Sequence, residues 1–457
     1  MNTLLRKRKK KTKTNKQEGA CCMKKLISFI LPLLFLCGCS MSVEELLSPP
    51  KLDEEQSAIY DALRLSKGGD VNLKYPVSGQ YRSAFVVQDI DDEPTNEAIV
   101  FYEASNVTDE GSSLRLNFLD RQDGNWVSVY DFAAMGSEVE KVQFADLGNS
   151  KTSIIITYSL QNSSDKGTSV FSYENNMPSE VYKSRHVYMN LIDINEDGAE
   201  EMFMINSDSA DNTAAVNLLG WEENGFSLLS SVPLSADFTA CRNIQLGNAT
   251  ATGRKGIFID YTLTDGAVGT DVMLCYDRSL TAAQIPAAQV KRRPNTYLPF
   301  ISCRDIDGDG IIEVPSAAPA PGYEDRPAGE QVSLTTWFEI SSSGANLHHE
   351  TTSYVSIRND YIFNIPLRWA GVVTMNISIA DGTATFSRYD KGANAAGEEL
   401  LIIRAVPEAS VSKLNLTGFT PCGKNETTDY CFFMQSSGNG SLALTEGEFE
   451  NLFRILE

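Results

Sequence analysis

From about residue 80, short apolar runs alternate with polar residues and are separated by turn residues. Residues 114–119 and 126–130 show the two-residue period of half-buried β-strands. Asp123, Gly124 and Asn125 lie between these two runs, and such residues tolerate the positive φ of tight turns. The pattern therefore predicts strands joined by hairpins, with few long helices.

The alternating runs form a repeat. Five segments share one plan: an apolar strand, an acidic turn, a second apolar strand and a hairpin. Four short strands in a unit of about 50 residues are typical of a propeller blade, and a β-sandwich with acidic loops is the alternative. The repeats fill residues 80–354. Their anchor positions are Asp89, Asp146, Asp193, Leu246 and Asp305.

Helices are predicted on both sides of the repeat. Acidic residues at 53–55 precede apolar residues at three-to-four spacing, which predicts a short helix over 53–66 that packs on the next domain. A second helix is predicted over 445–456, where Thr445 and Glu448 have the spacing of a capping box. Its apolar face would consist of Phe449, Leu452, Phe453 and Leu456.

The repeat pattern stops near residue 355. The apolar runs that follow predict a small antiparallel sheet with a hairpin turn at Asp381-Gly382. The aromatic run at 361–369 favours a core anchor over a ligand slot. This sheet and the helix at 445–456 are expected to form a separate α+β domain over residues 355–457. The apolar runs are 361–369, 372–379, 383–389 and 399–406.

The N-terminal region has the features of an export signal. Lys24 and Lys25 precede an apolar run over 26–36, which is too short to span a bilayer. The run ends in Leu36-Cys37-Gly38-Cys39, which resembles the lipobox of bacterial lipoproteins. The resemblance implies that Cys39 becomes the first residue, carries acyl chains such as palmitate, and anchors the protein on the extracytoplasmic face of the cell membrane.

A basic block at 6–11 precedes this signal. It is interpreted as a long basic extension, with translation starting at Met1 or Met23; a nucleic-acid-binding tail is the alternative. The expected organisation is a signal peptide with this extension (1–38), a lipid-anchored tether with a short helix (39–79), β-propeller-like repeats (80–354) and the C-terminal domain (355–457).

The charge of the chain disfavours binding to nucleic acid. The net charge is −21, and residues 1–38 carry ten Lys/Arg and one Glu, or +9, so the remainder is about −30. A body this acidic repels phosphates. Only three histidines are present, His186, His348 and His349, which disfavours histidine-based metal catalysis and a Ser/His/Asp triad.

One acidic turn is the strongest candidate for metal binding. Asp305, Asp307 and Asp309 alternate, with Gly308 and Gly310 following the second and third of them. Alternate positions on a tightly turning loop point inward, so the three carboxylates can converge on one cation. Hard oxygen ligands without His or Cys favour Ca²⁺ over Zn²⁺. A tight Asx turn without metal is the alternative.

This loop and the repeat plan resemble the integrin-α-type FG-GAP or VCBS repeats of β-propellers, and the whole arrangement is similar to uncharacterised lipoproteins of Gram-positive gut bacteria. The resemblance implies a mainly β fold, an approximately five-bladed β-propeller plus the C-terminal α+β domain, with structural calcium. It also implies that the Ile311 carbonyl and Glu313 complete the first ligand set. The second ligand set comprises Asp193, Asn195, Asp197, the Ala199 carbonyl and Glu201.

Two other acidic turns match less well. The turn at 89–97 has Pro94 where glycine is expected, and the turn at Asp146 lacks the later acids, so it is expected to be metal-free.

Five cysteines follow Cys39, an odd number that leaves at least one thiol unpaired within the chain. Cys422 and Cys431 flank a polar turn and are the candidate pair for a disulfide. Cys241, Cys275 and Cys303 lie in strand-like segments and are interpreted as buried small residues.

These observations favour a lipid-anchored binding or scaffold module that presents its loops to a protein or glycan, and not an enzyme. One alternative is a carbohydrate-active enzyme using paired carboxylates. Another is an envelope sensor or assembly factor that docks through the C-terminal domain.

Overall fold

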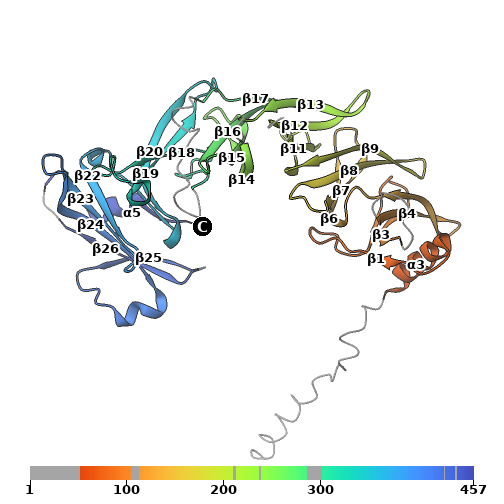
Figure 1. The fold of residues 1–457 in the computed structure, drawn as a ribbon, viewed down its shortest axis with the longest axis horizontal. Helices are drawn as coiled ribbons and strands as arrows, with labels where there is room; N and C mark the ends of the chain where they lie inside the picture. The colour runs from red at the N-terminus through yellow and green to blue at the C-terminus, as the bar shows by residue number, and fades with distance from the viewer. Residues whose placement is uncertain are drawn as a thin grey trace, which may run out of the picture. The chain divides into compact units, whose positions relative to one another are not determined.

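The computed structural model is drawn in Figure 1. The chain divides into two units between Tyr60 and Asp61. The predicted signal segment, Cys39 and the tether up to residue 51 lie outside the described residues. Within the described residues, no helix combines the length and hydrophobicity needed to cross a membrane. The structure describes residues 52–104, 113–208, 213–235, 238–285, 301–426, 428–437 and 440–456.

The predicted N-terminal helix is confirmed as α3 (Glu54–Lys67). Its first turn is acidic, which suits the positive end of the helix dipole. The Asp53 Oδ1 atom accepts a hydrogen bond from the Gln56 backbone N–H at 2.7 Å, so it satisfies one of the amides that a helix start leaves free.

The alternating region folds into antiparallel sheets, so the molecule is mainly β. In the first sheet the strand order is β1-β3-β4-β5, with β2 paired to β3. The second (β6–β9), third (β10–β13) and fourth (β14–β17) sheets each pair their four strands in chain order. The strands are β1 (Asn72–Leu73), β2 (Phe85–Gln88), β3 (Glu97–Glu103), β4 (Leu114–Gln122), β5 (Asn125–Ala133), β6 (Glu138–Asp146), β7 (Thr152–Ser159), β8 (Lys166–Glu174), β9 (Met177–His186), β10 (Tyr188–Ile192), β11 (Glu201–Asp208), β12 (Thr213–Glu222), β13 (Gly225–Pro233), β14 (Phe238–Asn248), β15 (Lys255–Leu263), β16 (Val268–Tyr276) and β17 (Ser279–Ala282).

The predicted four-strand plan is confirmed in the second, third and fourth sheets, whereas the first sheet has the additional strand β1. The predicted hairpins are also present. β4 and β5 pair around a turn at Asp123 (φ 51°) and Gly124 (φ 81°), where the backbone is left-handed as expected. The acidic turn of the first repeat lies between β2 and β3, and that of the third lies between β10 and β11. The repeat therefore marks where each sheet begins.

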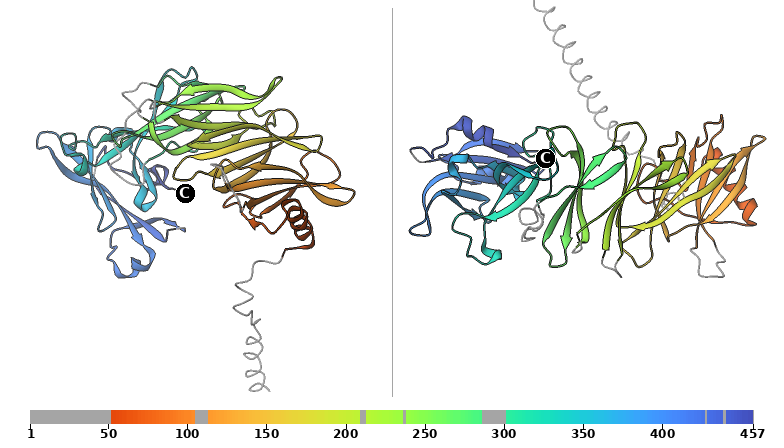
Figure 2. Two further views of the ribbon diagram at one scale, coloured as in Figure 1. Left: turned by 45° about the vertical axis from the view of Figure 1, so that its right-hand side comes forward. Right: turned by 90° about the horizontal axis from the view of Figure 1, so that it is seen from above.

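Consecutive sheets share apolar cores, and their strands stay next to one another in both views of Figure 2. Phe118 and Phe171 join the first and second sheets, with ring centroids 5.6 Å apart. Further clusters join the second to the third, the third to the fourth, and the fourth to the fifth sheet. Burial of such side chains stabilises the fold by about 1.5–3 kcal/mol each.

The fifth sheet corrects the expected domain boundary. Its order is β18-β19-β20-β21-β27. The boundary between residues 354 and 355 falls inside β20, and β21 hydrogen-bonds to β20 as its direct continuation. The chain does not change domain there because the run at 361–364 completes the fifth repeat. The strands are β18 (Val314–Pro319), β19 (Ser333–Ile340), β20 (Leu347–Ser356), β21 (Tyr361–Asn364) and β27 (Phe453–Ile455).

The sixth sheet has the order β22-β23-β24-β26-β25 and packs with α5 (Glu446–Leu452) around an aromatic core. Trp369 is fully buried there, and its Nε1 donates to the Leu442 carbonyl at 2.8 Å, so the aromatic run anchors the core as expected. The strands and 3₁₀ turns are β22 (Val373–Ser378), β23 (Thr383–Asp390), β24 (Ala395–Pro407), β25 (Thr420–Asn425), β26 (Tyr430–Ser436), η1 (Ala328–Glu330), η2 (Ile357–Asn359), η3 (Leu367–Trp369) and η4 (Glu408–Lys413).

The predicted C-terminal helix is right at its start and too long at its end. Thr445 and Glu448 form the capping box, with the Thr445 hydroxyl accepting from the Glu448 N–H. The helix ends at Leu452, and Phe453 begins β27, which pairs with β21. Phe453 still packs into the core, but as a strand residue, because pairing with the fifth sheet replaces a further helical turn.

Candidate metal centres

The loop over residues 305–313 is closed by its own backbone. Arg304 and Glu313 form an antiparallel bridge, in which the Glu313 N–H donates to the Arg304 carbonyl at 3.0 Å. Inside the loop, the Asp305 carboxylate accepts from Gly308 N (2.6 Å) and Gly310 N (2.9 Å). Both glycines have φ near +87°, a conformation that L side chains rarely adopt. The glycines thus let the chain wrap around Asp305.

Glu313 is the buried carboxylate of this loop, with no exposed surface. Its Oε2 accepts from the Ile306 N–H at 2.7 Å, whereas its Oε1 is buried without a hydrogen-bond partner. Burial raises the pKa of Glu313 to about 8; the Ile306 N–H opposes the rise, and Asp307 and Asp305 add to it. An unpaired buried carboxylate is costly, so the site favours a cation.

Asp305, Asp307 and Glu313 offer carboxylate oxygens that all lie within 4.8 Å of one another. The orphaned Glu313 oxygen and the all-oxygen donor set fit a hard cation such as Ca²⁺. Asp309 was also expected as a ligand, but it is exposed, lies outside this group and accepts from the Ile311 N–H at 2.7 Å. The Ile311 carbonyl remains a predicted ligand.

The loop over residues 89–97 has the same convergence of carboxylates, although its sequence matches the calcium-loop pattern less well than that of the 193–201 loop. Asp89, Asp91 and Glu97 also bring their oxygens within 4.8 Å of one another. Glu97 is 2% exposed and its Oε2 accepts from Ile90 N at 2.8 Å. Burial raises the pKa of Glu97 to about 7. The unexpected Pro94 does not prevent this convergence.

The loop over residues 193–201 keeps the same backbone pattern but contains a cation from the chain itself. Glu201 is fully buried, and its Oε2 accepts from the Ile194 N–H at 3.3 Å. Its Oε1 accepts from the Arg278 Nε at 3.0 Å, and Arg278 Nη1 donates to the Trp221 carbonyl at 2.9 Å. Burial raises the pKa of Glu201, and the Ile194 N–H and Arg278 oppose this. Arg278 thus donates to the Oε1 atom of Glu201, whereas the corresponding Oε1 atom of Glu313 has no hydrogen-bond partner.

The other predicted ligands of this loop bond to one another. Asp193 accepts from Asp197 N (3.1 Å) and Gly198 N (2.9 Å). Asp197 accepts from Ala199 N at 2.8 Å and from the Asn195 side-chain amide at 2.9 Å. These contacts hold the turn without metal. The sequence contains no local signal for the Glu201–Arg278 pair, because Arg278 lies on the turn between β16 and β17 in the next sheet.

The space for Arg278 comes from two glycines. A Cβ atom at Gly220 would lie 2.5 Å from Arg278 Nη2, and one at Gly148 would lie 2.9 Å from it. Gly148 belongs to the acidic turn of the second repeat, where Asp146 Oδ1 accepts from Gly148 N, Asn149 N and Ser150 N at 2.9–3.0 Å. Backbone amides therefore surround the Oδ1 atom of Asp146 in that turn.

The predicted disulfide between Cys422 and Cys431 is wrong for this structure, in which both thiols are free. The register places Lys424 opposite Cys431. Cys422 falls in an irregularity between Pro421 and Gly423 and packs against the core of the sixth sheet. Of the other three cysteines, Cys275 and Cys303 are buried, and Cys241 is partly exposed.

No protein-family model matches the chain, and no curated protein matches it. Solved structures show a weak similarity. A protein assigned as a 6-phosphogluconolactonase from Bacteroides uniformis ATCC 8492 is 10% identical over 72% of this chain and 94% of that chain, with a TM-score of 0.28. A counterpart with the same assignment from Bacteroides fragilis NCTC 9343 is 8% identical over 72% and 92%, with a TM-score of 0.22.

A hypothetical selenium-binding protein from Sulfolobus tokodaii is 11% identical over 45% of this chain and 55% of that chain, with a TM-score of 0.22. Similarity this low carries no argument about activity or ligand.

Proposed function

We propose that the chain is a membrane-anchored extracytoplasmic lipoprotein whose propeller-type FG-GAP/VCBS repeats form a calcium-stabilised binding or scaffold module. The ligand would be a protein or glycan, and the acidic body disfavours nucleic acid. The observation that carries the calcium part is the Glu313 Oε1 atom, buried without a partner beside Asp305 and Asp307.

The residues of the 305–313 loop suit a structural role for calcium. Asp305, Asp307 and Glu313 would bind the ion, which would neutralise a buried carboxylate. Glu313 directly precedes β18 and bridges to Arg304, so the ion would fix the start of the fifth sheet. The groups that would bind the ion are carboxylates and a backbone carbonyl, and the proposed role of the loop is structural and not catalytic.

Thermal unfolding with added calcium and with a chelator tests this role. Extracellular calcium modules bind with a Kd of about 10⁻⁴–10⁻³ M, so the melting temperature should rise at about millimolar calcium. Glu313→Gln keeps the side-chain volume and removes the charge, so it should abolish that rise at this site without lowering calcium-free stability. Glu398→Gln changes an exposed glutamate of β24 and is the matched control.

The calcium responses of the two carboxylate clusters, in the 305–313 loop and in the 89–97 loop, can be measured separately with one variant in each. Asp305→Asn should remove one part of the calcium response and Asp89→Asn the other. An identical melting temperature with calcium and with chelator in the unmodified chain would rule out a stabilising calcium site.

The membrane anchor has an independent test. Cys39→Ala should leave an unprocessed precursor that incorporates no fatty-acid analogue, whereas Cys22→Ala, upstream of the apolar run, should be labelled normally. Equal labelling of the Cys39→Ala variant and the unmodified chain would contradict the anchor.

A further inference from the structure

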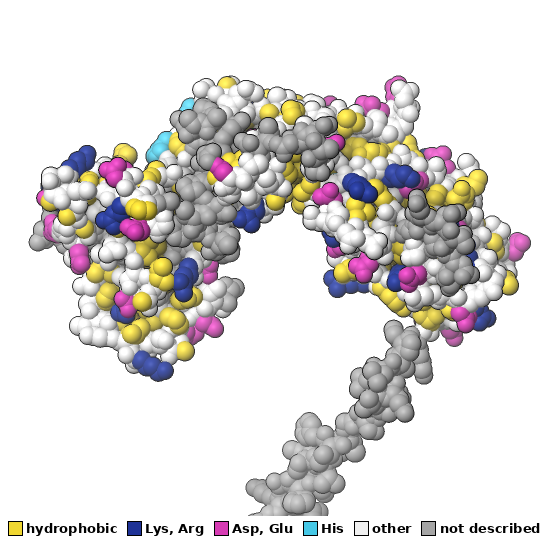
Figure 3. Space-filling model, viewed as in Figure 1, with side chains coloured by type: hydrophobic (Ala, Val, Ile, Leu, Met, Phe, Trp, Pro, Cys, Tyr) yellow, Lys and Arg dark blue, Asp and Glu magenta, His cyan; other side chains and the backbone are white. Residues whose placement is uncertain are grey.

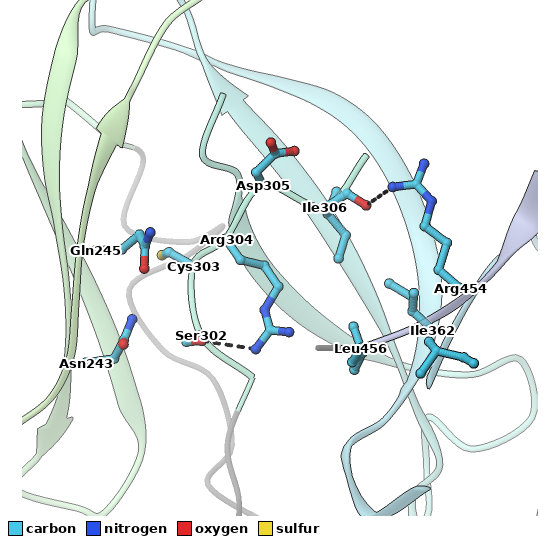
Figure 4. Close-up of a pocket in the computed structure, with 11 residues that line it drawn as sticks. Asn243, Gln245, Ser302, Cys303, Arg304, Asp305, Ile306, Ile362, Arg454 and Leu456 are labelled. Atoms are coloured by element: carbon cyan, nitrogen blue, oxygen red, sulfur yellow. Dashed lines mark hydrogen bonds between the residues drawn. The ribbon is translucent and has the colours of Figure 1, made fainter. Parts of the chain in front are cut away.

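A cavity of about 500 Å³ lies where β14 of the fourth sheet meets the fifth sheet (Figure 4). Its volume is within the range of about 300–1,000 Å³ that small-molecule sites occupy. One wall is polar and includes Gln245 and Ser302, and the other is apolar and includes Ile362 and Leu456. Arg304 lies between them in the view of Figure 4. The cavity therefore combines apolar contact with hydrogen-bonding groups.

Arg304 is one of three charged residues that line the cavity, together with Asp305 and Arg454. It is partly buried, and burial lowers its pKa, with the Asp260 charge opposing that effect. Among the described residues no carboxylate lies within ion-pair distance of its guanidinium, which donates only to the Ser302 hydroxyl, at 3.5 Å. A guanidinium has five N–H donors, so most of those of Arg304 remain available.

Other half-buried arginines of the molecule show what a structural guanidinium looks like. Arg278 donates to Glu201, and Arg115 forms an ion pair with Asp131 at 2.7 Å. Acidic and basic side chains are interspersed over the face drawn in Figure 3. Arg304 differs from these two arginines because its N–H donors face a cavity and do not contact a carboxylate.

A buried carboxylate holds the polar wall in place. Asp260 is fully buried and accepts from Cys303 N (3.0 Å), Thr270 Oγ1 (2.5 Å) and the Asn243 side-chain amide (3.3 Å). These bonds fix the segment that carries Arg304 against β14. Gln245, two residues beyond Asn243, lines the cavity, and its side-chain amide forms no hydrogen bond with the described residues. The wall thus presents the Gln245 side-chain amide beside a guanidinium that has unused N–H donors.

The opposite side adds a second arginine. Arg454 of β27 lines the cavity and donates from Nη1 to the Ile306 carbonyl at 3.0 Å (Figure 4). In the described part of the chain, it too has no carboxylate within ion-pair distance. Two arginines without acidic partners around one cavity are unusual in a body with a net charge of about −30 (−21 minus +9).

We propose that this cavity binds a small polar molecule carrying an oxyanion, with the Arg304 guanidinium on the oxyanion and the Gln245 amide on a hydroxyl or carbonyl. Planar guanidinium groups match carboxylate and phosphate oxygens through paired N–H donors. The apolar wall at Ile362 and Leu456 would contact the body of the ligand. The inference rests on the proposed binding function and names its site and ligand class.

Calorimetric titration of the purified full-length chain tests this at constant ionic strength, with glucuronate, inorganic phosphate and glucose as probes. Glucuronate or phosphate should bind at one site and glucose at least about tenfold more weakly, since a charged hydrogen bond contributes about 1.5–3 kcal/mol. Tighter binding of glucuronate identifies a carboxylate ligand, and tighter binding of phosphate identifies a phosphorylated one.

Variants of the residues that line the cavity test whether the binding measured by calorimetry occurs there. Arg304→Gln should weaken anion binding about tenfold or more, and Arg304→Lys should restore part of it. Arg388→Gln, on the exposed side of β23, is the matched control and should bind normally. Gln245→Leu provides a second test if Arg304→Gln fails to fold. Absence of binding by both anions, equal binding of glucose, or unchanged binding by both cavity variants would overturn the proposal.

The calcium response of the same samples separates the two proposals. If calcium raises the melting temperature and neither anion binds, the cavity proposal fails alone. If an anion binds through Arg304 and calcium has no effect, the calcium role fails alone.

Discussion

At the scale of single residues, two acidic turns differ in how they satisfy the hydrogen bonds of a buried glutamate. Both acidic turns bury a glutamate whose Oε2 accepts a backbone N–H. In one turn the remaining oxygen accepts from Arg278, and in the other it has no partner. Related loops of one chain therefore differ in whether the chain itself supplies a donor to the second oxygen of the buried glutamate.

The first prediction concerns Arg278→Gln. The substitution leaves Glu201 buried without its guanidinium, so we expect destabilisation of about 3 kcal/mol, the lower end for breaking a buried ion pair because a quarter of Arg278 is exposed. Calcium at about millimolar concentration should restore part of the loss, since the vacated turn still holds Asp193 and Asp197. Chemical denaturation with calcium and with chelator measures both effects. Loss of stability without calcium rescue would show that the turn cannot bind the ion.

The second prediction concerns pH. The pKa of Glu313 is raised from 4.5 to about 8 in the folded chain, so the folded state holds a proton that the unfolded state has lost. Without calcium, this group should therefore lower stability progressively as pH rises from about 4.5 through about 8. Urea midpoints across this range should fall less in Glu313→Gln and less in the unmodified chain with calcium. A pH dependence unaffected by both changes would contradict the prediction.

At the scale of elements, α5 and β27 connect the sixth sheet to the fifth. α5 is held by its capping box and by Phe449, which is 1% exposed. β27 follows directly and pairs with β21 through Phe453, Arg454 and Ile455. The segment after Leu444 thus contributes to two cores.

The third prediction is that truncation after Leu444 affects more than the sixth sheet. It removes β27 and the Arg454 bond to the Ile306 carbonyl, so it should weaken the calcium response of the 305–313 loop. Thr445→Ala removes only the cap and should cost about 0.5–2 kcal/mol without changing calcium affinity. Calorimetric calcium titration of both variants distinguishes these effects. Unchanged calcium affinity after truncation would show that the loop is independent of β27.

The sequence predicts local features of this chain well and distant ones poorly. The capping box and the turn containing Asp305 involve residues within nine positions, so their spacing reveals them. The pairing of β27 with β21 and the contact of Arg278 with Glu201 join separate repeats, and no periodicity encodes them. The same holds for Arg304, whose importance depends on what lies around it in three dimensions.

At the scale of the whole molecule, the calcium loop and the cavity share a segment. Asp305 belongs to the carboxylate group and also lines the cavity. Ile306 donates its N–H to Glu313 and accepts from Arg454 at its carbonyl. Binding at one of these two sites should therefore change the affinity of the other.

The fourth prediction is reciprocal coupling between calcium and an anion. Calcium bound by Asp305 and Asp307 would lower the negative charge beside Arg304, so calcium should tighten glucuronate or phosphate binding. The anion must then tighten calcium binding by the same factor. Titration of each ligand in the presence of the other measures both factors, and Asp305→Asn should reduce them. Equal anion affinity with calcium and with chelator would exclude the coupling.

The placement of β27 also constrains the order of folding. The strand that completes the fifth sheet follows the whole sixth sheet in the chain. During synthesis, the second, third and fourth sheets can pair their strands as they emerge, because their neighbouring strands are consecutive in the chain. The fifth sheet must wait with one edge of β21 unpaired until the sixth sheet and α5 have been made. An exposed strand edge invites wrong pairing, so this interval is the stage of synthesis at which the chain most needs protection by a chaperone.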